Sequence, residues 1–251
     1  MPESKIAIFI PAYNAASTLP LVLDRIPQEI KEKVKQIFLI DNASPDSTYL
    51  IGIGYREHKG LHNLQVFRNE TNRGYGGSQK MAYRYAIDSG FDIVVMLHGD
   101  AQYAPEKIPF LLEPLERDEA DLAFGSRIAG LPLKGGMPLY KFLGNKFLTM
   151  IENTILGMNL TEFHSGFRAF RCSALAQVPF HLCADDYHFD TDIIIQFKIK
   201  NFRICERPIP TYYGKEKSYV NVVSYGCNVL KSVFTYWLWS KGWIKVKKFD
   251  M

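Results

Sequence analysis

Three polar side chains, His98, Asp100 and Gln102, directly follow the apolar run from Ile93 to Leu97. Such a run is typical of a buried strand, and open α/β sheets bind ligands at the carboxyl ends of their strands. If the turn stays extended, the imidazole, carboxylate and amide groups point to one side, where together they can hold a divalent cation. A plain loop in which Asp100 caps the next helix is the alternative.

Two further polar clusters follow apolar runs nearer the N-terminus. Residues 11–14 (PAYN) come after the run at 6–10, and residues 41–46 (DNASPD) come after the run at 36–40. Because the carboxyl ends of neighbouring parallel strands meet at one edge, we expect all three clusters to line a single pocket. Each cluster also fits an ordinary helix start or turn.

Asp41 ends a strand-like run, so its carboxylate needs a partner to offset the cost of desolvation. A nucleobase N–H or a ribose hydroxyl is one such partner, and a purely structural partner is the alternative. Uracil and guanine both present N–H donors, so Asp41 does not distinguish the two bases.

Three glycines lie in the segment 72–78 (NRGYGGS), ahead of a helix that we expect to begin near Ser78. Glycine lets the backbone approach a ligand closely at such a position. The spacing matches neither the dinucleotide-binding motif nor the P-loop motif. A tight loop without a ligand is the alternative.

Strand-like runs alternate with helical patterns along the first half of the chain, which predicts an α/β fold with a mostly parallel sheet. Further helices and one late strand are predicted beyond them. The strands are expected at 6–10, 36–40, 64–67, 93–97, 121–124 and 203–209, and the helices at about 17–32, 139–156, 190–200 and 220–238. The glycine- and proline-rich segment 128–138 is typical of a mobile loop that serves as a lid.

The composition favours one globular domain and excludes several classes of protein. The chain has 251 residues, 47% of them hydrophobic, and a formal net charge of +4, which is too mild for a dedicated nucleic-acid binder. Four cysteines are spaced too widely for a zinc or redox motif, so we expect reduced packing residues. A signal peptide and a membrane-spanning run are not expected, which predicts a cytoplasmic chain, either free or resting on a membrane.

Six segments, taken in order, resemble the family-2 glycosyltransferases. Within that family they are similar to the polyprenyl-phosphate sugar transferases typified by dolichol-phosphate mannose synthase. The resemblance covers the chain to about residue 220 and implies the GT-A fold, a Rossmann-like, mostly parallel central sheet flanked by helices. The segments are 10–15 (IPAYNA), 41–46 (DNASPD), 72–77 (NRGYGG), 100–102 (DAQ), 125–127 (GSR) and 165–171 (SGFRAFR).

The resemblance implies a nucleotide-sugar donor and a divalent cation, Mg²⁺ or Mn²⁺, bound to its diphosphate. His98 stands where the family usually has the first Asp of its D-x-D motif, which leaves Asp100 and Gln102 as oxygen ligands. Because an imidazole suits Mn²⁺ better than Mg²⁺, the exchange leaves the metal identity open. The residues implied to bind the donor are Pro11, Tyr13, Asn14, Asp41, Asn42, Gly74, Gly77, His98, Arg127 and Lys217.

Catalytic roles are predicted for Asp100, Arg168, Asp190 and Asp192. Guanidinium groups pair with phosphate oxygens, so Arg127, Arg168 and Arg171 are candidates to clamp the diphosphate or an anionic acceptor, and Arg168 is favoured. Asp190 and Asp192 either complement a helix dipole or supply the base that a hydroxyl acceptor needs. A lipid phosphate is already anionic near neutral pH and needs no base.

An apolar stripe followed by lysines marks the C-terminal segment as an amphipathic helix with a basic tail. Such a helix lies on an anionic membrane surface, packs on the core, or meets a second copy of the chain. We predict a glycosyltransferase domain at 1–219, with a nucleotide-binding half at about 1–127 and an acceptor half at about 128–219. The helix and tail then occupy 220–251.

The predicted function is inverting transfer of a hexose from a GDP- or UDP-linked sugar to a polyprenyl (dolichyl or undecaprenyl) phosphate at the cytosolic membrane face. One alternative keeps the donor but uses a saccharide hydroxyl as acceptor. A second alternative, which the His98 exchange favours, is a catalytically inactive nucleotide-binding protein. The sugar, the base and the oligomeric state stay open.

Overall fold

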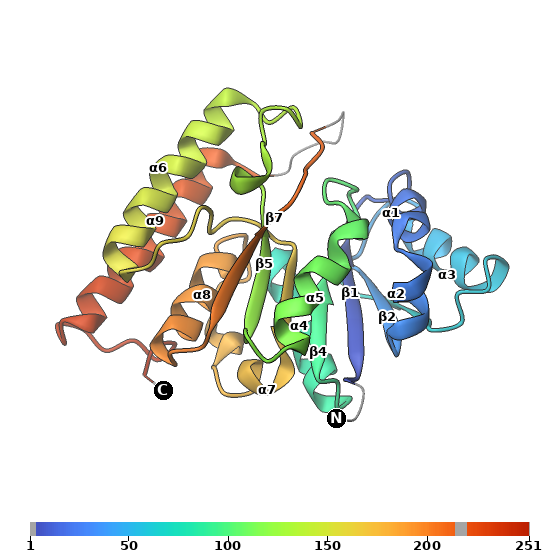
Figure 1. The fold of residues 1–251 in the computed structure, drawn as a ribbon, viewed down its shortest axis with the longest axis horizontal. Coiled ribbons are helices and arrows are strands. Elements are labelled where there is room, and N and C mark those ends of the chain that lie inside the picture. The colour runs from blue at the N-terminus through green and yellow to red at the C-terminus, as the bar shows by residue number, and fades with distance from the viewer. Residues whose placement is uncertain (1–3, 214–219, 251) are drawn as a thin grey trace.

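A seven-stranded sheet forms the centre of the computed structural model, which describes residues 4–213 and 220–250 (Figure 1). The strand order is β3-β2-β1-β4-β6-β5-β7. All neighbouring strands pair in parallel except β6, which is antiparallel to both β4 and β5. The strands are β1 (Ile6–Ala12), β2 (Gln36–Asp41), β3 (Leu64–Arg68), β4 (Ile93–Met96), β5 (Leu122–Ser126), β6 (Arg168–Arg171) and β7 (Ile204–Pro208). This arrangement confirms the predicted α/β class.

Helices cover both faces of the sheet because alternate strand residues point to opposite sides. One apolar layer packs Ile6, Ile8 and Ile10 of β1 against α1, α2, α3 and α5. The other layer packs Ala7 and Phe9 against α4, α7 and α8. The helices are α1 (Leu19–Arg25), α2 (Gln28–Lys33), α3 (Thr48–His58), α4 (Gly74–Asp88), α5 (Ile108–Glu116), α6 (Leu139–Leu156), α7 (Cys172–Leu175), α8 (Phe189–Ile199) and α9 (Val222–Ser240).

The structure divides the helix predicted at 17–32 into α1 and α2. Pro27 causes the break, because a proline has no backbone N–H and disfavours helical geometry in the residue before it. Ile26 accordingly has an extended ψ of 123°. The sequence analysis also missed α3 and the short strand β6, although it placed the other six strands correctly.

The glycine-rich segment belongs to α4, which begins at Gly74 rather than near Ser78. Its glycines make room for another part of the chain. The amide of Gly76 donates a hydrogen bond to the carbonyl oxygen of Asp185 at 2.8 Å. A Cβ on Gly76 would lie only 2.2 Å from the carbonyl oxygen of Ala184. Gly77, predicted to bind the donor, likewise faces Arg73 and Asp185 and does not line the pocket.

The segment predicted as a mobile lid packs along residues 209–213. A Cβ on Gly130 would lie 1.8 Å from the carbonyl oxygen of Ile209, and the amide of Tyr213 donates to the carbonyl of Gly135 at 2.9 Å. The segment begins with one 3₁₀ turn, Ile128–Gly130, and leads into α6.

The C-terminal helix α9 packs against α6 and α8, and α6 and α9 run side by side at the left of Figure 1. Phe249 in the tail is fully buried. The predicted boundary at 219/220 stays a prediction, because residues 214–219 lie outside the described part. Within residues 4–213 and 220–250, no helix has both the length and the hydropathy needed to cross a bilayer. All four cysteines are free, as expected.

Candidate functional site

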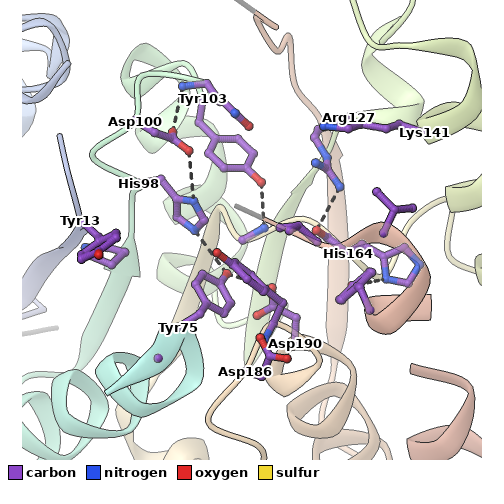
Figure 2. A pocket seen from close by; sticks show the side chains of 18 of the residues that line it. Tyr13, Tyr75, His98, Asp100, Tyr103, Arg127, Lys141, His164, Asp186 and Asp190 are labelled. Carbon is purple, nitrogen blue, oxygen red and sulfur yellow. Dashed lines mark hydrogen bonds and ion pairs between the residues drawn. The ribbon is translucent and has the colours of Figure 1, made fainter. Parts of the chain in front are cut away.

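A pocket of about 950 Å³ opens at the carboxyl ends of β1 and β4 (Figure 2). β1 pairs with β2 on one side and β4 on the other, so the strand order reverses here and leaves a crevice where α/β sheets bind ligands. As the sequence predicts, all three polar clusters contribute to its lining. The predicted site residues found there are Pro11, Tyr13, Asn14, Asn42, Gly74, His98, Asp100, Gln102, Arg127 and Asp190.

The polar turn after β2 supports the turn after β1. The backbone amides of residues 14, 15 and 16 donate to the side chains of Ser44, Thr48 and Asp46 at 3.0, 2.9 and 3.1 Å. Burial alone would raise the pKa of Asp46, but its hydrogen bonds with Thr48 and the Ala16 amide bring the pKa below its usual value. This network orients the Tyr13 and Asn14 side chains at the pocket.

Asp41, predicted to contact the donor, does not line the pocket. Its carboxylate is fully buried, and the Arg68 guanidinium lies 3.3 Å from Oδ2. Oδ1 accepts the amide of Ser44 at 3.1 Å. The desolvation of this carboxylate is therefore offset within the protein. Asn42 lines the pocket and binds the 69–74 segment through both its amide nitrogen and its carbonyl oxygen.

The turn after β4 places its three polar side chains in the pocket by a different geometry from the predicted one. It is not extended, because Ala101 has a φ of +62°. The amide of Gln102 donates to Oδ1 of Asp100 at 3.0 Å. The Asp100 carboxylate thus has Oδ1 bound to the backbone, while its Oδ2 lies 3.9 Å from Nδ1 of His98.

The donor set of this turn fits a hard divalent cation that also binds substrate. The Asp100 side chain is 41% exposed and faces the pocket, with Gln102 beside it. The described residues contain no group of three His, Cys, Asp or Glu side chains that could hold a metal alone. Mg²⁺ in phosphate-transfer sites uses one or two carboxylates and takes its other ligands from phosphates and water. One carboxylate and one amide match that pattern.

Arg127 lies at the pocket edge and forms a buried ion pair with Glu162. Its backbone amide donates to Oε2 of Glu162 at 2.7 Å, its Nε donates to Oε1 at 2.8 Å, and its Nη2 binds Oε1 as well. Burial alone would raise the pKa of Glu162, but the guanidinium brings it below its usual value. The pair holds Arg127 still, with part of the guanidinium available at the pocket.

Arg168, the favoured candidate for a phosphate clamp, lies in the core rather than at the pocket. The side chain is fully buried and does not line the pocket. Its guanidinium donates to the carbonyl oxygens of Ser165, Phe163 and Asp190 at 2.7, 2.7 and 3.0 Å. Nη1 also lies 3.7 Å from Oδ1 of Asp190. Arg171, another candidate for the clamp, forms ion pairs with Asp118 and Asp121.

The two carboxylates at the start of α8 have different positions. Asp190 lines the pocket and accepts the Tyr75 hydroxyl at 2.9 Å. Asp192 is fully buried away from the pocket, 2.7 Å from Nζ of Lys248, and accepts the amide of Ala184 at 3.0 Å. Asp192, for which a catalytic role was predicted, therefore anchors the C-terminal tail. Lys217 lies outside the described residues.

Several lining residues escaped the sequence analysis, among them Tyr75, Lys141 and His164. Tyr75 stands inside the quoted glycine segment, where its aromatic side chain was a usable signal. Lys141 is a cation in the first turn of a strongly apolar helix. Within the described part of the chain, no carboxylate pairs with Lys141, and its ammonium group lies 5.7 Å from the centre of the Tyr213 ring. Burial, then the charge of Arg127, lowers the pKa of Lys141.

Comparisons with known sequences identify relatives over most of the chain. The family model described as "Glycosyl transferase family 2" matches residues 7–178. A UDP-N-acetylglucosamine–dolichyl-phosphate N-acetylglucosaminyltransferase of Methanococcus voltae is 30% identical over 223 residues, covering 85% of this chain and 88% of that protein. An undecaprenyl-phosphate mannosyltransferase of Micrococcus luteus is 29% identical over 218 residues, covering 84% and 85% of the two chains.

Solved structures confirm the predicted fold. Glucosyl-3-phosphoglycerate synthase from Mycobacterium tuberculosis, in complex with UDP, superposes with a TM-score of 0.70 at 19% identity, covering 93% of this chain and 80% of that one. A second structure of that enzyme, with Mn²⁺, UDP-glucose and phosphoglyceric acid, gives a TM-score of 0.65 at 18% identity with the same coverage.

If Arg168 is a core residue, its replacement should cost stability. We expect Arg168→Met to lower the free energy of unfolding by about 3–5 kcal/mol, because it leaves three carbonyls unbonded and the Asp190 carboxylate without its counter-charge. Urea unfolding measures this. Arg171→Met in the same strand is the matched control, with an expected loss of about 1 kcal/mol or less. An Arg168→Met protein of wild-type stability with weakened donor binding would restore the clamp role.

Proposed function

The chain belongs to glycosyl transferase family 2, and on that premise we propose that it transfers a hexose from a nucleoside-diphosphate sugar to a polyprenyl phosphate. A phosphate oxygen of the acceptor attacks the anomeric carbon opposite the diphosphate. The bond to the diphosphate breaks, the nucleoside diphosphate leaves, and the configuration inverts. The single observation that carries the proposal is a pocket lined both by the polar turns after β1, β2 and β4 and by apolar side chains of α6 and α9, with Lys141 among its lining residues.

The polar end suits the donor. Tyr13, Asn14, Asn42 and Gly74 line that end, where a nucleoside would bind. Asp100 and Gln102 would hold a divalent cation, Mg²⁺ or Mn²⁺, which supplies positive charge to the diphosphate as it departs. The solved Mn²⁺ complex of the structurally similar synthase supports this choice. Arg127 adds a fixed positive charge at the pocket edge.

The apolar end suits the first isoprene units of a lipid. It is lined by Phe147 and Leu148 of α6 and by Val222, Val223 and Leu230 of α9. Lys141 stands where this groove meets the polar end, beside Arg127. A phosphate bound here would gain a counter-charge and relieve the two cations of their mutual repulsion. The relatives named for dolichyl and undecaprenyl phosphate support the same acceptor class.

The carboxylates near the acceptor side favour a phosphate over a saccharide hydroxyl. A hydroxyl acceptor needs a base to remove its proton, whereas a lipid phosphate does not. Asp192 is bound by Lys248, and Asp190 is bound by Tyr75 and Arg168. Both carboxylates, Asp190 and Asp192, are thus bound by other side chains and are poorly placed to take a proton from a hydroxyl. A saccharide hydroxyl is therefore only the alternative acceptor.

We further propose that the chain binds peripherally to an anionic membrane at the cytosolic face, through α6 and the C-terminal segment. Leu139, Tyr140, Leu143, Phe147 and Met150 on α6 are each 55–62% exposed. The segments 128–151 and 220–249 contain lysines and no acidic residue. Such a face attracts anionic lipids and repels a second copy of itself.

The direct test uses radiolabelled UDP- and GDP-sugars, undecaprenyl phosphate and Mn²⁺, followed by partition between organic solvent and water. We expect label in the organic phase with the wild-type protein. Asp100→Ala should abolish transfer without changing the circular dichroism spectrum, and Asp88→Ala, an exposed aspartate on α4, should retain it. Label transferred only to saccharides in the aqueous phase would contradict the lipid acceptor. Tight nucleotide binding without any turnover would contradict the enzymatic function.

Lys141→Ala should raise the KM for the lipid phosphate by about 10- to 100-fold while the KM for the donor stays within about twofold, because it removes one charged contact to the acceptor. Steady-state kinetics with each substrate varied in turn measures both values. Lys146→Ala, an exposed lysine one turn further along α6, is the matched control. Equal effects of the two substitutions would show that only general surface charge matters.

Sedimentation with vesicles tests the membrane surface. The double variant Leu143→Gln and Met150→Gln changes two exposed residues of α6 that do not line the pocket. It should bind phosphatidylglycerol-containing vesicles at least about 10-fold more weakly than wild type, since it loses apolar area that the bilayer would bury. Leu50→Gln on α3, at the opposite end of the molecule, should bind normally (Figure 1). Wild-type protein that stays in the supernatant would rule this surface out.

A further inference from the structure

His98 is held from one side of its ring. Its Nε2 lies 3.3 Å from the hydroxyl oxygen of Tyr75, within hydrogen-bond distance. Its Nδ1 lies 3.9 Å from Oδ2 of Asp100, which is too far for a hydrogen bond. Figure 2 shows the ring between these two side chains, with Tyr75 leading on to Asp190. Nε2 is therefore hydrogen-bonded, and Nδ1 faces the turn that carries Asp100.

The number of available protons sets the direction of the bond between Tyr75 and His98. The single hydroxyl proton of Tyr75 is donated to Oδ2 of Asp190 at 2.9 Å. A phenol keeps this proton near neutral pH. Its oxygen can then only accept from His98, which places a proton on Nε2. In a neutral imidazole, Nδ1 is left with a lone pair.

Asp190 is well placed to accept the last hydrogen bond in the series from His98 through Tyr75. Nη1 of Arg168 lies 3.7 Å from its Oδ1, and the side-chain amide of Gln79 donates to the same oxygen at 3.5 Å. The fully buried guanidinium and this amide both hold the Asp190 carboxylate in place.

Neighbouring residues pack closely around the contact between His98 and Tyr75. A Cβ on Gly166 would lie 2.4 Å from Nε2 of His98 and 2.5 Å from the Tyr75 hydroxyl. The ring of Tyr187 stacks on Tyr75 with centres 5.0 Å apart, and Tyr103 meets the His98 ring edge to face at 5.1 Å. A side chain at position 166 would therefore separate the imidazole from the phenol.

We propose that Tyr75 is a positioning residue that fixes the tautomer of His98, so that Nδ1 serves beside Asp100 as a ligand for the cation of the donor complex. Histidine ligands commonly donate their other ring N–H to a fixed acceptor, which selects the ligating nitrogen. Two atoms 3.9 Å apart can share one cation at about 2.1 Å from each. The inference rests on the proposed donor site and assigns a nitrogen ligand to it, which favours Mn²⁺ over Mg²⁺.

The tautomer is measurable in the metal-free protein by ¹⁵N NMR after selective labelling of its six histidines. The His98 signals are assigned by their loss in His98→Gln. We expect wild-type His98 to carry its proton on Nε2 and Tyr75→Phe to populate the Nδ1–H form, because the acceptor for Nε2–H is gone. A wild-type Nδ1–H tautomer would overturn the proposal.

The consequence for the cation is measured by calorimetric titration of UDP and of GDP at increasing Mn²⁺. Tyr75→Phe should raise the Mn²⁺ concentration at half-maximal nucleotide binding by about 10- to 100-fold. Gly166→Ala, which keeps the hydroxyl but separates it from His98, should act in the same direction. Tyr85→Phe, on the same helix but bonded to Gln36, is the matched control and should leave the midpoint unchanged.

An unchanged midpoint in Tyr75→Phe would show that His98 is not a ligand that Tyr75 positions. Neither readout needs sugar transfer. If wild-type protein binds nucleotide with Mn²⁺ and transfers no sugar, the proposed acceptor chemistry fails while the tautomer result stands. If transfer occurs and the tautomer is wrong, only the inference about Tyr75 fails.

Discussion

The buried guanidinium of Arg168 determines how the two sides of the pocket face each other. It lies on β6, the strand inserted antiparallel between β4, which leads to Asp100, and β5, which leads to Arg127. Its hydrogen bonds reach the carbonyls of the 163–165 segment and of Asp190. Because an unpaired guanidinium in the core is very costly, these partners cannot move independently of the sheet. The turn that carries Asp100 and the pocket edge that carries Arg127 therefore keep a constant separation.

Polar turns hold one another in the same way on the nucleotide side. The turn after β2 binds the backbone amides of residues 14–16, and the hydroxyl of Thr18 binds the carbonyl of Gly99 at 2.7 Å. Each turn is thus fixed by a neighbour as well as by its own strand. Ligand-binding side chains on turns of this kind are positioned before the ligand arrives, which lowers the entropy lost on binding.

The sheet and the pocket rim were predictable because they depend on local patterns: apolar runs that end in polar residues. The buried roles of Asp41 and Asp192 depend on partners such as Arg68 and Lys248, which are distant in sequence, and no local pattern names such a partner. The start of α4 was predicted wrongly for a related reason. Its glycines make room for the backbone at 184–185, which is distant in sequence. Pro27 was visible in the sequence, and its break between α1 and α2 could have been read from it.

The pocket draws its two ends from separate stretches of chain. The turns after β1, β2 and β4 line one part of the pocket, whereas α6 and α9 line another. Substitutions in α6 or α9 would accordingly change one part of the lining and leave the turns after β1, β2 and β4 in place. Such a division would let related proteins change one part of the pocket by substitution while the other part stays the same.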